Sequence, residues 1–208
     1  RIIYKVSYYW INFKRTIILY LVMKIIALVG LPGSGKSTAA ALFNKKGFQI
    51  IRFGDITEEY LKKAGLSLNE KNERAIRESL RKENGMEAYA KLNKDNIDRS
   101  LKHGKVVIDG LYSWEEYVLL KQEFPELIVL AIYASPDLRY NRLVDRQVRP
   151  RTFEQSKSRD KKEIENLNKA APIAMADYTI TNVGTFYDLE LSYRKFLEWV
   201  NEKEEENN

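Results

Sequence analysis

The chain contains the stretch Gly30-Leu31-Pro32-Gly33-Ser34-Gly35-Lys36-Ser37, which satisfies the pattern G-x-x-x-x-G-K-[ST] in full. An apolar run at 25–29 precedes it and a helical pattern follows it, which is the setting that this phosphate-binding loop, the P-loop, requires. Its glycines permit backbone conformations in which successive N–H groups face phosphate oxygens, and the helix dipole adds to the attraction. The sequence therefore predicts a nucleotide-binding site here.

The polar residues of this loop have distinct expected roles. Lys36 is expected to reach the β- and γ-phosphates, and the hydroxyl of Ser37 is placed to bind Mg²⁺. The expected cofactors are therefore ATP and Mg²⁺. The predicted nucleotide contacts within the loop are Gly30, Gly33, Ser34, Gly35, Lys36, Ser37 and Thr38.

Outward from the loop, short apolar runs alternate with longer helical patterns, which is typical of parallel strands joined by crossover helices. Strands are expected at 24–29, 48–52, 105–108, 127–133 and 178–181. Helices are expected at 36–46, 56–64, 69–83, 86–103, 114–123, 136–147, 158–171 and 185–203. The predicted fold class is α/β, a P-loop protein with a five-stranded, mostly parallel sheet and helices on both faces.

The 208 residues predict one main domain, spanning 23–200. A helical insertion at 56–103 is expected to cover the mouth of the sheet, and a basic loop at 147–159 is expected to be a lid. The tail at 201–208 is polar and acidic. No cysteine is present, which excludes disulfides, thiolate metal sites and a cysteine nucleophile, and fits a cytoplasmic location.

The net charge of +6 is unevenly distributed along the chain. Residues 1–22 carry four of the positive charges, lack acids and precede Met23, so we expect them to be an upstream extension. A membrane segment is the alternative, but half of the apolar run at 17–31 is needed as the first strand, and a spanning helix requires about 20 apolar residues. The nearly balanced remainder predicts neither a nucleic-acid nor a membrane partner.

Two aspartates are candidates for the site because each follows a predicted strand. Asp109 ends the run at 106–108 and is a candidate Mg²⁺ ligand through water; the alternative is a turn or helix-capping acid. Asp55 follows the second strand and could orient an acceptor hydroxyl or act as its base, or cap the next helix. His103, the only histidine, lies at a predicted helix end and receives no catalytic role.

Arginines gather after the fourth strand. Arg139, Arg142 and Arg146 are spaced i, i+3 and i+7, which predicts one side of a helix. A solvated basic face is the ordinary explanation. We favour a functional one because the run leads into the predicted lid, and phosphoryl transfer requires guanidinium groups near the transferred group.

The arrangement resembles the P-loop nucleoside-monophosphate kinase family, in particular its adenylate-kinase-related and dephospho-CoA-kinase-like branch, over residues 23 to about 200. The resemblance rests on residues 30–38, Phe53-Gly54-Asp55, Val107-Ile108-Asp109-Gly110, Ala134-Ser135-Pro136-Asp137 with Arg139, Arg142-Leu143 and Arg146, Ser158-Arg159-Asp160, and Ala176-Asp177-Tyr178 with Ile180 and Asn182.

The resemblance implies roles for residues outside the loop. It implies that Arg142, Arg146 and Arg159 contact adenine or phosphates as the lid closes, and that Asn182 lies beside the adenine. It implies that Asp55 meets the acceptor, and it makes Arg74, Arg77 and Arg81 candidate phosphate contacts in the acceptor-binding insertion. The lid lacks the paired acids usual in adenylate kinases, and the Asp109-Gly110 region differs from the usual dephospho-CoA kinase sequence, so the acceptor stays open.

The predicted function is an ATP-dependent nucleotide kinase that transfers the γ-phosphoryl group of Mg-ATP to a nucleotide or nucleotide-like small molecule. Dephospho-CoA kinase is one alternative, and an ATP-dependent switch or nucleic-acid-associated ATPase is another. A guanine-reading Asn-Lys-x-Asp element is not present at the right place, because Asn93-Lys94-Asp95-Asn96 lacks the final acid. The expected oligomeric state is a monomer or a small homo-oligomer.

Overall fold

The computed structural model describes residues 24–206. Its strands are β1 (Ile25–Val29), β2 (Gln49–Arg52), β3 (Val106–Asp109), β4 (Ile128–Tyr133) and β5 (Tyr178–Thr181). Its helices are α2 (Lys36–Asn44), α3 (Asp55–Lys63), α4 (Glu70–Asn84), α5 (Ala88–His103), α6 (Trp114–Glu123), α7 (Pro136–Val144), α8 (Phe153–Leu167), α9 (Ala170–Ala174) and α10 (Phe186–Glu206). The expected extension at 1–22 lies outside the described residues.

The strands form one sheet in the order β2-β3-β1-β4-β5, and every pairing is parallel. β1 lies at the centre, and its five residues are fully buried. A continuous apolar run is what a parallel strand covered on both faces needs. The predicted α/β class and five-stranded sheet are confirmed, and the sheet, which was predicted to be mostly parallel, is parallel throughout.

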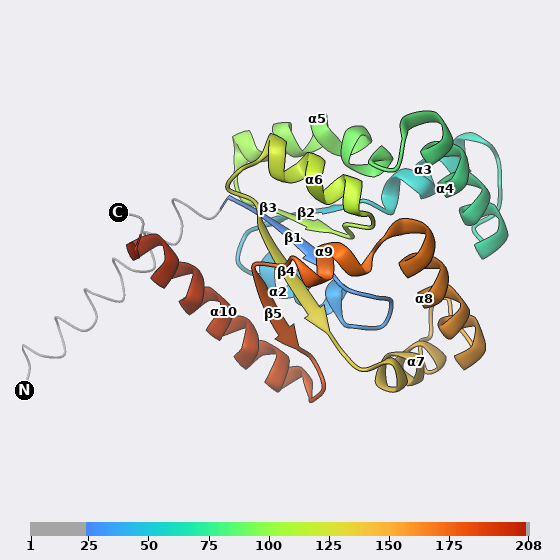
Figure 1. The fold of residues 1–208 in the computed structure, drawn as a ribbon. Coiled ribbons are helices and arrows are strands. Elements are labelled where there is room, and N and C mark those ends of the chain that lie inside the picture. Colours follow the sequence, from blue (N-terminus) through green and yellow to red (C-terminus); the bar gives the residue numbers. More distant parts are fainter. Residues whose placement is uncertain (1–23, 207–208) are drawn as a thin grey trace, which may run out of the picture.

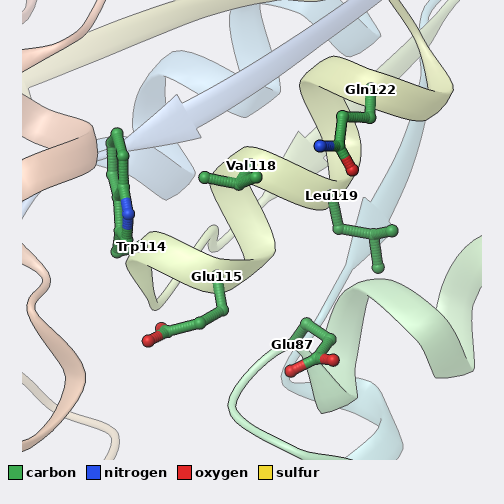
Figure 2. Close-up of a pocket in the computed structure, with 6 residues that line it drawn as sticks. All are labelled: Glu87, Trp114, Glu115, Val118, Leu119 and Gln122. Carbon is green, nitrogen blue, oxygen red and sulfur yellow. The ribbon is translucent and has the colours of Figure 1, made fainter.

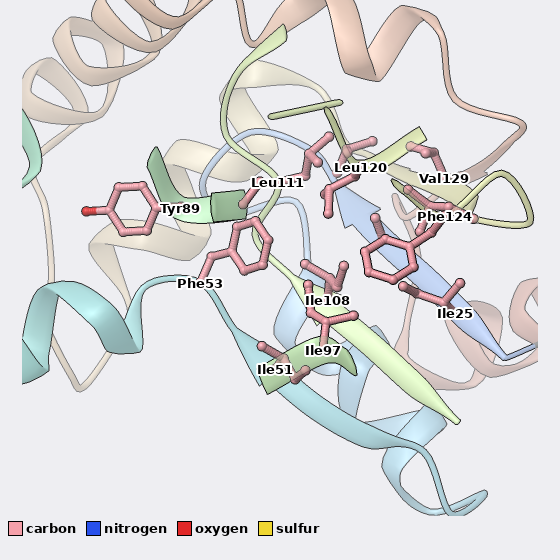
Figure 3. Close-up of a cluster of buried hydrophobic side chains, with 14 of the residues drawn as sticks. Ile25, Ile51, Phe53, Tyr89, Ile97, Ile108, Leu111, Leu120, Phe124 and Val129 are labelled. Atoms are coloured by element: carbon pink, nitrogen blue, oxygen red, sulfur yellow. The ribbon is translucent and has the colours of Figure 1, made fainter. Parts of the chain in front are cut away.

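Helices cover both faces of the sheet (Figure 1). Successive strand side chains point to opposite faces, so β1 contributes to two cores. Ile25, Ala27 and Val29 pack in one core with residues of α5 and α6, part of which is drawn in Figure 3. Ile26 and Leu28 pack in the other core with residues of α2 and α10. Because β1 packs on both faces and ends at Val29, the start of the P-loop at Gly30 is held in place by the core.

Helix boundaries differ from expectation around the predicted lid. α7 ends at Val144 instead of continuing to 147, and the backbone N–H of Arg151 donates to the carbonyl of Leu143 beside the helix end. α8 begins at Phe153 instead of 158, because Thr152 and Gln155 form a reciprocal capping box. The irregular segment is therefore 145–152, and the rest of the predicted lid is helical.

The C-terminal half of the predicted helix at 158–171 also differs. α8 ends before Asn168, which adopts a left-handed conformation with φ of 49°. A new short helix, α9, follows. Asparagine tolerates this conformation better than most residues, so Asn168 can redirect the chain. Within residues 24–206, no helix is both long and apolar enough to cross a membrane.

Candidate functional site

The P-loop turns from β1 into α2 through glycines with positive φ. Gly33 and Gly35 have φ of 80° and 102°, in the left-handed region that side chains disfavour. A Cβ atom at Gly33 would lie 2.6 Å from the carbonyl oxygen of Arg139. α2 begins directly at Lys36, so the N–H groups of its first turn face the loop. The loop can therefore meet an anion with backbone donors.

The amine of Lys36 lies over this loop. Its Nζ donates hydrogen bonds to the carbonyl oxygens of Gly30 and Leu31, at 2.8 and 3.2 Å. Burial of the amine, followed in importance by the positive charge of Lys169, lowers the pKa of Lys36 to about 7. The negative charge of a phosphate group within reach of the amine would oppose both causes and raise the pKa of Lys36. Lys36 is thus poised to gain a proton when an anion binds.

We expect nucleotide binding to be coupled to proton uptake by Lys36. Its pKa in the free protein is about 7 and its ordinary value is 10.5, so at pH 8 the free protein holds this amine mostly neutral. Bound phosphates favour the charged form and raise the pKa. Calorimetric titration of Mg-ADP in buffers of different ionisation enthalpy should show net proton uptake at pH 8 and much less at pH 6. Lys36→Met should abolish the pH 8 uptake; an unchanged uptake would contradict this assignment.

Ser37 and Asp109 bring two oxygen ligands together at the carboxyl edge of the sheet. β1 and β3 pair with Leu28 opposite Asp109, and the hydroxyl of Ser37 donates to Oδ2 of Asp109 at 3.3 Å. This donor set fits Mg²⁺, which takes few protein oxygens and completes its shell with phosphates and water. No group of three or more potential metal-binding His, Cys, Asp or Glu side chains exists within the described part of the chain.

Lys169 is a candidate site residue that sequence reasoning missed. Its side chain is buried, its amine lies 2.5 Å from Oε2 of Glu163, and it faces the ring of Tyr112 at 5.0 Å. Glu163 also accepts a 2.7 Å hydrogen bond from Nε of Arg159. Although burial alone would raise it, Lys169 and Arg159 hold the pKa of Glu163 well below its usual range. The only signal in the sequence is that Lys169 directly precedes the apolar run at 170–176.

The predicted lid arginines lie on different elements. Arg142 is partly buried on α7, and its Nη1 is buried with no hydrogen-bond partner among residues 24–206. Arg146 is exposed and follows the end of α7, so the expectation that Arg139, Arg142 and Arg146 share one helix side is wrong. Arg159 lies on α8 and pairs with Glu163.

The guanidinium of Arg139 is hydrogen-bonded to the backbone of the P-loop. Its guanidinium donates to the carbonyl oxygens of Pro32 and Ala134, at 3.0 and 3.1 Å, and pairs with Asp160 at 2.5 Å. The side chain is only 3% exposed. Because no donor is left facing solvent, Arg139 supports the loop rather than a ligand.

Asn182 also contacts the P-loop directly. It follows β5 and is buried, and its Nδ2 donates to the carbonyl oxygen of Ser34 at 2.8 Å. Its backbone N–H donates to the carbonyl of Tyr133 at 2.7 Å. Asn182 therefore connects the ends of β4 and β5 to the loop. Thr38 lies in the first turn of α2 and is exposed.

Asp55 lies at the start of the helical insertion. It is the first residue of α3, where Gly54 occupies the N-cap position, and its carboxylate is 3.4 Å from the guanidinium of Arg52. Its side chain is 58% exposed. Partial burial raises the pKa of Asp55, and Arg52 opposes this effect. The carboxylate is therefore open to a ligand at the carboxyl edge of the sheet.

Aromatic and hydroxyl groups form the inner wall of the insertion. The hydroxyl groups of Thr57 and Tyr89 are hydrogen-bonded, and the ring of Tyr89 meets that of Tyr112 edge-on with centroids 5.6 Å apart. The guanidinium of Arg81 lies over the Tyr89 ring at 5.1 Å. Since Tyr112 also faces Lys169, this wall adjoins the charged group beside the P-loop.

Glu116 is a second buried acid close to this wall. Its carboxylate accepts the backbone N–H of Tyr112 at 2.7 Å. Burial raises the pKa of Glu116 to about 7, and Arg81 opposes this effect.

Arg74, unlike Arg81, lies on the outer surface of α4 and pairs with Glu78 at 2.7 Å. The three arginines of α4 therefore do not form one group.

A shallow hollow of about 320 Å³ lies elsewhere, along the outer side of α6 (Figure 2). It is lined by Glu87, Trp114, Glu115, Val118, Leu119 and Gln122. The lining includes none of the predicted site residues, so it takes no part in the candidate site.

Comparison with known families places the chain among P-loop proteins. The AAA domain family model matches residues 26–168. A UPF0200 protein of Thermococcus kodakarensis is 36% identical over 181 residues, covering 85% of this chain and 97% of that protein. A UPF0200 protein of Pyrococcus abyssi is 36% identical over 182 residues, covering 83% of this chain and 97% of its own length.

Solved structures of kinases share the fold. A gluconokinase from Sinorhizobium meliloti aligns with a TM-score of 0.58 at 14% identity, covering 90% of this chain and 98% of that one. A shikimate kinase from Bacteroides thetaiotaomicron aligns with a TM-score of 0.56 at 16% identity, covering 85% and 98%. The chain thus has the P-loop kinase fold and belongs to the AAA domain family and to the UPF0200 proteins.

Proposed function

We propose that this chain is a small-molecule kinase that transfers the γ-phosphoryl group of Mg-ATP to a nucleotide or nucleotide-like acceptor. The observation that carries the proposal is the charged group which joins the P-loop to the helical insertion. Lys36 is close enough to Lys169 for the two charges to interact, Lys169 pairs with Glu163, and Arg159 pairs with both Glu163 and Glu70 of α4. Such a bridge suits transfer between a donor on the loop and an acceptor under the insertion.

On the donor side, each residue has a proposed task. Lys36 contacts the β- and γ-phosphates, together with the backbone N–H groups of residues 33–38. Ser37 and Asp109 would hold Mg²⁺, Asp109 through water, and the ion would neutralise phosphate charge. Asn182 is proposed to lie beside the adenine. Arg142 has a buried donor without a partner in the described chain, which supports a contact with the nucleotide.

Positive side chains are proposed to stabilise the negative charge that develops on the transferred phosphoryl group. Arg159 and Lys169 are proposed to face the transferred phosphoryl group, with Arg146 joining as the lid closes. Preorganised cations are worth more in a site from which water is excluded. Asp55 is proposed to orient the acceptor, because its carboxylate is accessible at the carboxyl edge of the sheet where ligands of such folds bind.

Acceptor-dependent ADP release tests this function. Full-length protein is given Mg-ATP with each of a panel of nucleoside monophosphates, dephospho-CoA, gluconate and shikimate, and ADP is measured. The proposal expects one acceptor class to stimulate release, and Lys36→Ala to remove the stimulation. Slow release that ignores every acceptor and rises with DNA or RNA would instead indicate a nucleic-acid-associated ATPase.

A further inference from the structure

The carboxylate of Glu70 forms ion pairs with three guanidinium groups. Oε1 lies 2.8 Å from Nη2 of Arg77, and Oε2 lies 3.2 Å from Nη2 of Arg151 and 3.3 Å from Nη1 of Arg159. Arg77 lies on α4, whereas Arg151 lies in the irregular segment at 145–152 and Arg159 on α8, both far from α4 in sequence. The predicted lid and the helical insertion therefore share this carboxylate, at the end of the molecule where α4 and α8 lie (Figure 1).

The three guanidiniums are less exposed than the carboxylate that they share. Arg77, Arg151 and Arg159 are each no more than a quarter exposed, whereas the side chain of Glu70 is 55% exposed. Burial, followed by the positive charge of Arg159, lowers the pKa of Arg151. Like charges are thus held together at a partly desolvated position, with an accessible anion between them.

The charges around Glu70 favour a dianion in place of its carboxylate. The ion-paired group comprises the cations Arg77, Arg149, Arg151, Arg159 and Lys169 and the acids Glu58, Glu70, Glu73 and Glu163. If Glu70 left, five positive charges would face three negative ones. The excess of two matches the charge of a phosphomonoester dianion, and paired guanidiniums fit phosphate oxygens geometrically.

The position of this group relative to the P-loop suits an acceptor. Arg159 also pairs with Glu163, Glu163 pairs with Lys169, and both Lys169 and Arg159 contribute to the lowered pKa of Lys36. A ligand held by Arg77, Arg151 and Arg159 would therefore lie across this charged bridge from the phosphates on the loop. That is the side formed by the helical insertion.

We propose that Arg77, Arg151 and Arg159 form a binding site for a phosphate group of the acceptor, and that Glu70 occupies this site in the free protein. Glu70 then sets acceptor selectivity, because a dianion can displace its carboxylate from the three guanidiniums and a neutral molecule cannot. The proposal rests on the proposed function and narrows its acceptor to a phosphomonoester. Glu70 lies in the first turn of α4 and is half exposed, so its side chain can turn out into solvent.

Binding of inorganic phosphate tests the site without requiring turnover. Glu70→Gln keeps the side-chain shape and removes its charge. Glu78→Gln is the matched control, because Glu78 lies on the same helix and pairs with the exposed Arg74. All variants carry Lys36→Ala, which weakens phosphate binding on the P-loop, and calorimetry at pH 7.5 measures the dissociation constant for phosphate. Thermal melting checks that each variant is folded.

We expect Glu70→Gln to bind phosphate at least about tenfold more tightly than its parent, and Glu78→Gln to match the parent. Adding Arg77→Gln should abolish this increase in affinity. The affinity for acetate, a monoanion, should increase less than the affinity for phosphate. The proposal is overturned if Glu70→Gln binds phosphate no more tightly than its parent, or if the increase in affinity persists with Arg77→Gln. It is also overturned if the affinity for acetate increases as much as the affinity for phosphate. Absence of ADP release with every acceptor would reject the kinase function and leave this phosphate measurement unaffected.

Discussion

Replacing Lys36 with alanine is expected to lower the rate of phosphoryl transfer by a factor on the order of 10²–10³, which is the usual effect of removing one positioned donor from a developing anion. The amine is the only charged group on the loop itself, and it already lies within hydrogen-bond distance of the loop carbonyls of Gly30 and Leu31. Backbone N–H groups would remain in the variant, so nucleotide affinity should fall less than turnover.

The matched control for this loss is Lys45→Ala. Lys45 occupies the C-cap of the same helix, at the end away from the loop, so its removal changes the net charge equally. Its steady-state rate with the stimulating acceptor should stay within about twofold of the parent, as expected for a surface charge. Lys36→Ala retaining a third or more of the parent rate would contradict the role assigned to this amine.

Replacing Arg139 with methionine is expected to lower the free energy of unfolding by about 3–5 kcal/mol, the usual cost of leaving one partner of a buried ion pair uncompensated. Arg139 and Asp160 are 3% and 8% exposed, and the guanidinium also satisfies the carbonyl oxygens of Pro32 and Ala134. Denaturant unfolding followed by circular dichroism measures the loss.

An exposed ion pair supplies the control for Arg139. Arg194 and Glu190 pair at 3.0 Å on α10 with side chains 66% and 37% exposed, so Arg194→Met should cost less than about 1 kcal/mol. Adding Asp160→Asn to Arg139→Met should recover part of the loss, because it removes the unpaired charge. A cost for Arg139→Met no larger than that of the control would show that the contacts of Arg139 contribute little.

The sheet and the P-loop were predictable because their signals are local. The five residues of β1 form an uninterrupted apolar run, and the glycines at 33 and 35 stand where the backbone requires positive φ. Such patterns depend on neighbours along the chain, so a single sequence is sufficient to read them.

The charged group around Glu163 was not predictable in the same way. Lys169 and Glu163 are six residues apart across a helix end, and Arg159 joins Glu70 from 89 positions away. Only the tertiary structure brings them together. Arg139 was misjudged because helical spacing gives the side of a helix but not what packs against it, and here that side faces the P-loop.

The sequence itself contains the signal for the start of α8. Thr152 and Gln155 satisfy the S/T-x-x-E/Q pattern, which marks a helix start at Phe153. The basic residues of the same segment instead predicted a longer loop. The correction leaves a shorter irregular segment, whose Arg149 and Arg151 pair with acids of α3 and α4.

The fate of the γ-phosphoryl group tests the central claim most directly. Full-length protein is incubated with Mg-ATP labelled at the γ-phosphate and the stimulating acceptor, and the products are separated. The kinase function predicts that label moves onto the acceptor in a one-to-one ratio with ADP formed, and that Lys36→Ala abolishes the labelled product. Label released only as inorganic phosphate, at a rate independent of the acceptor, would contradict it.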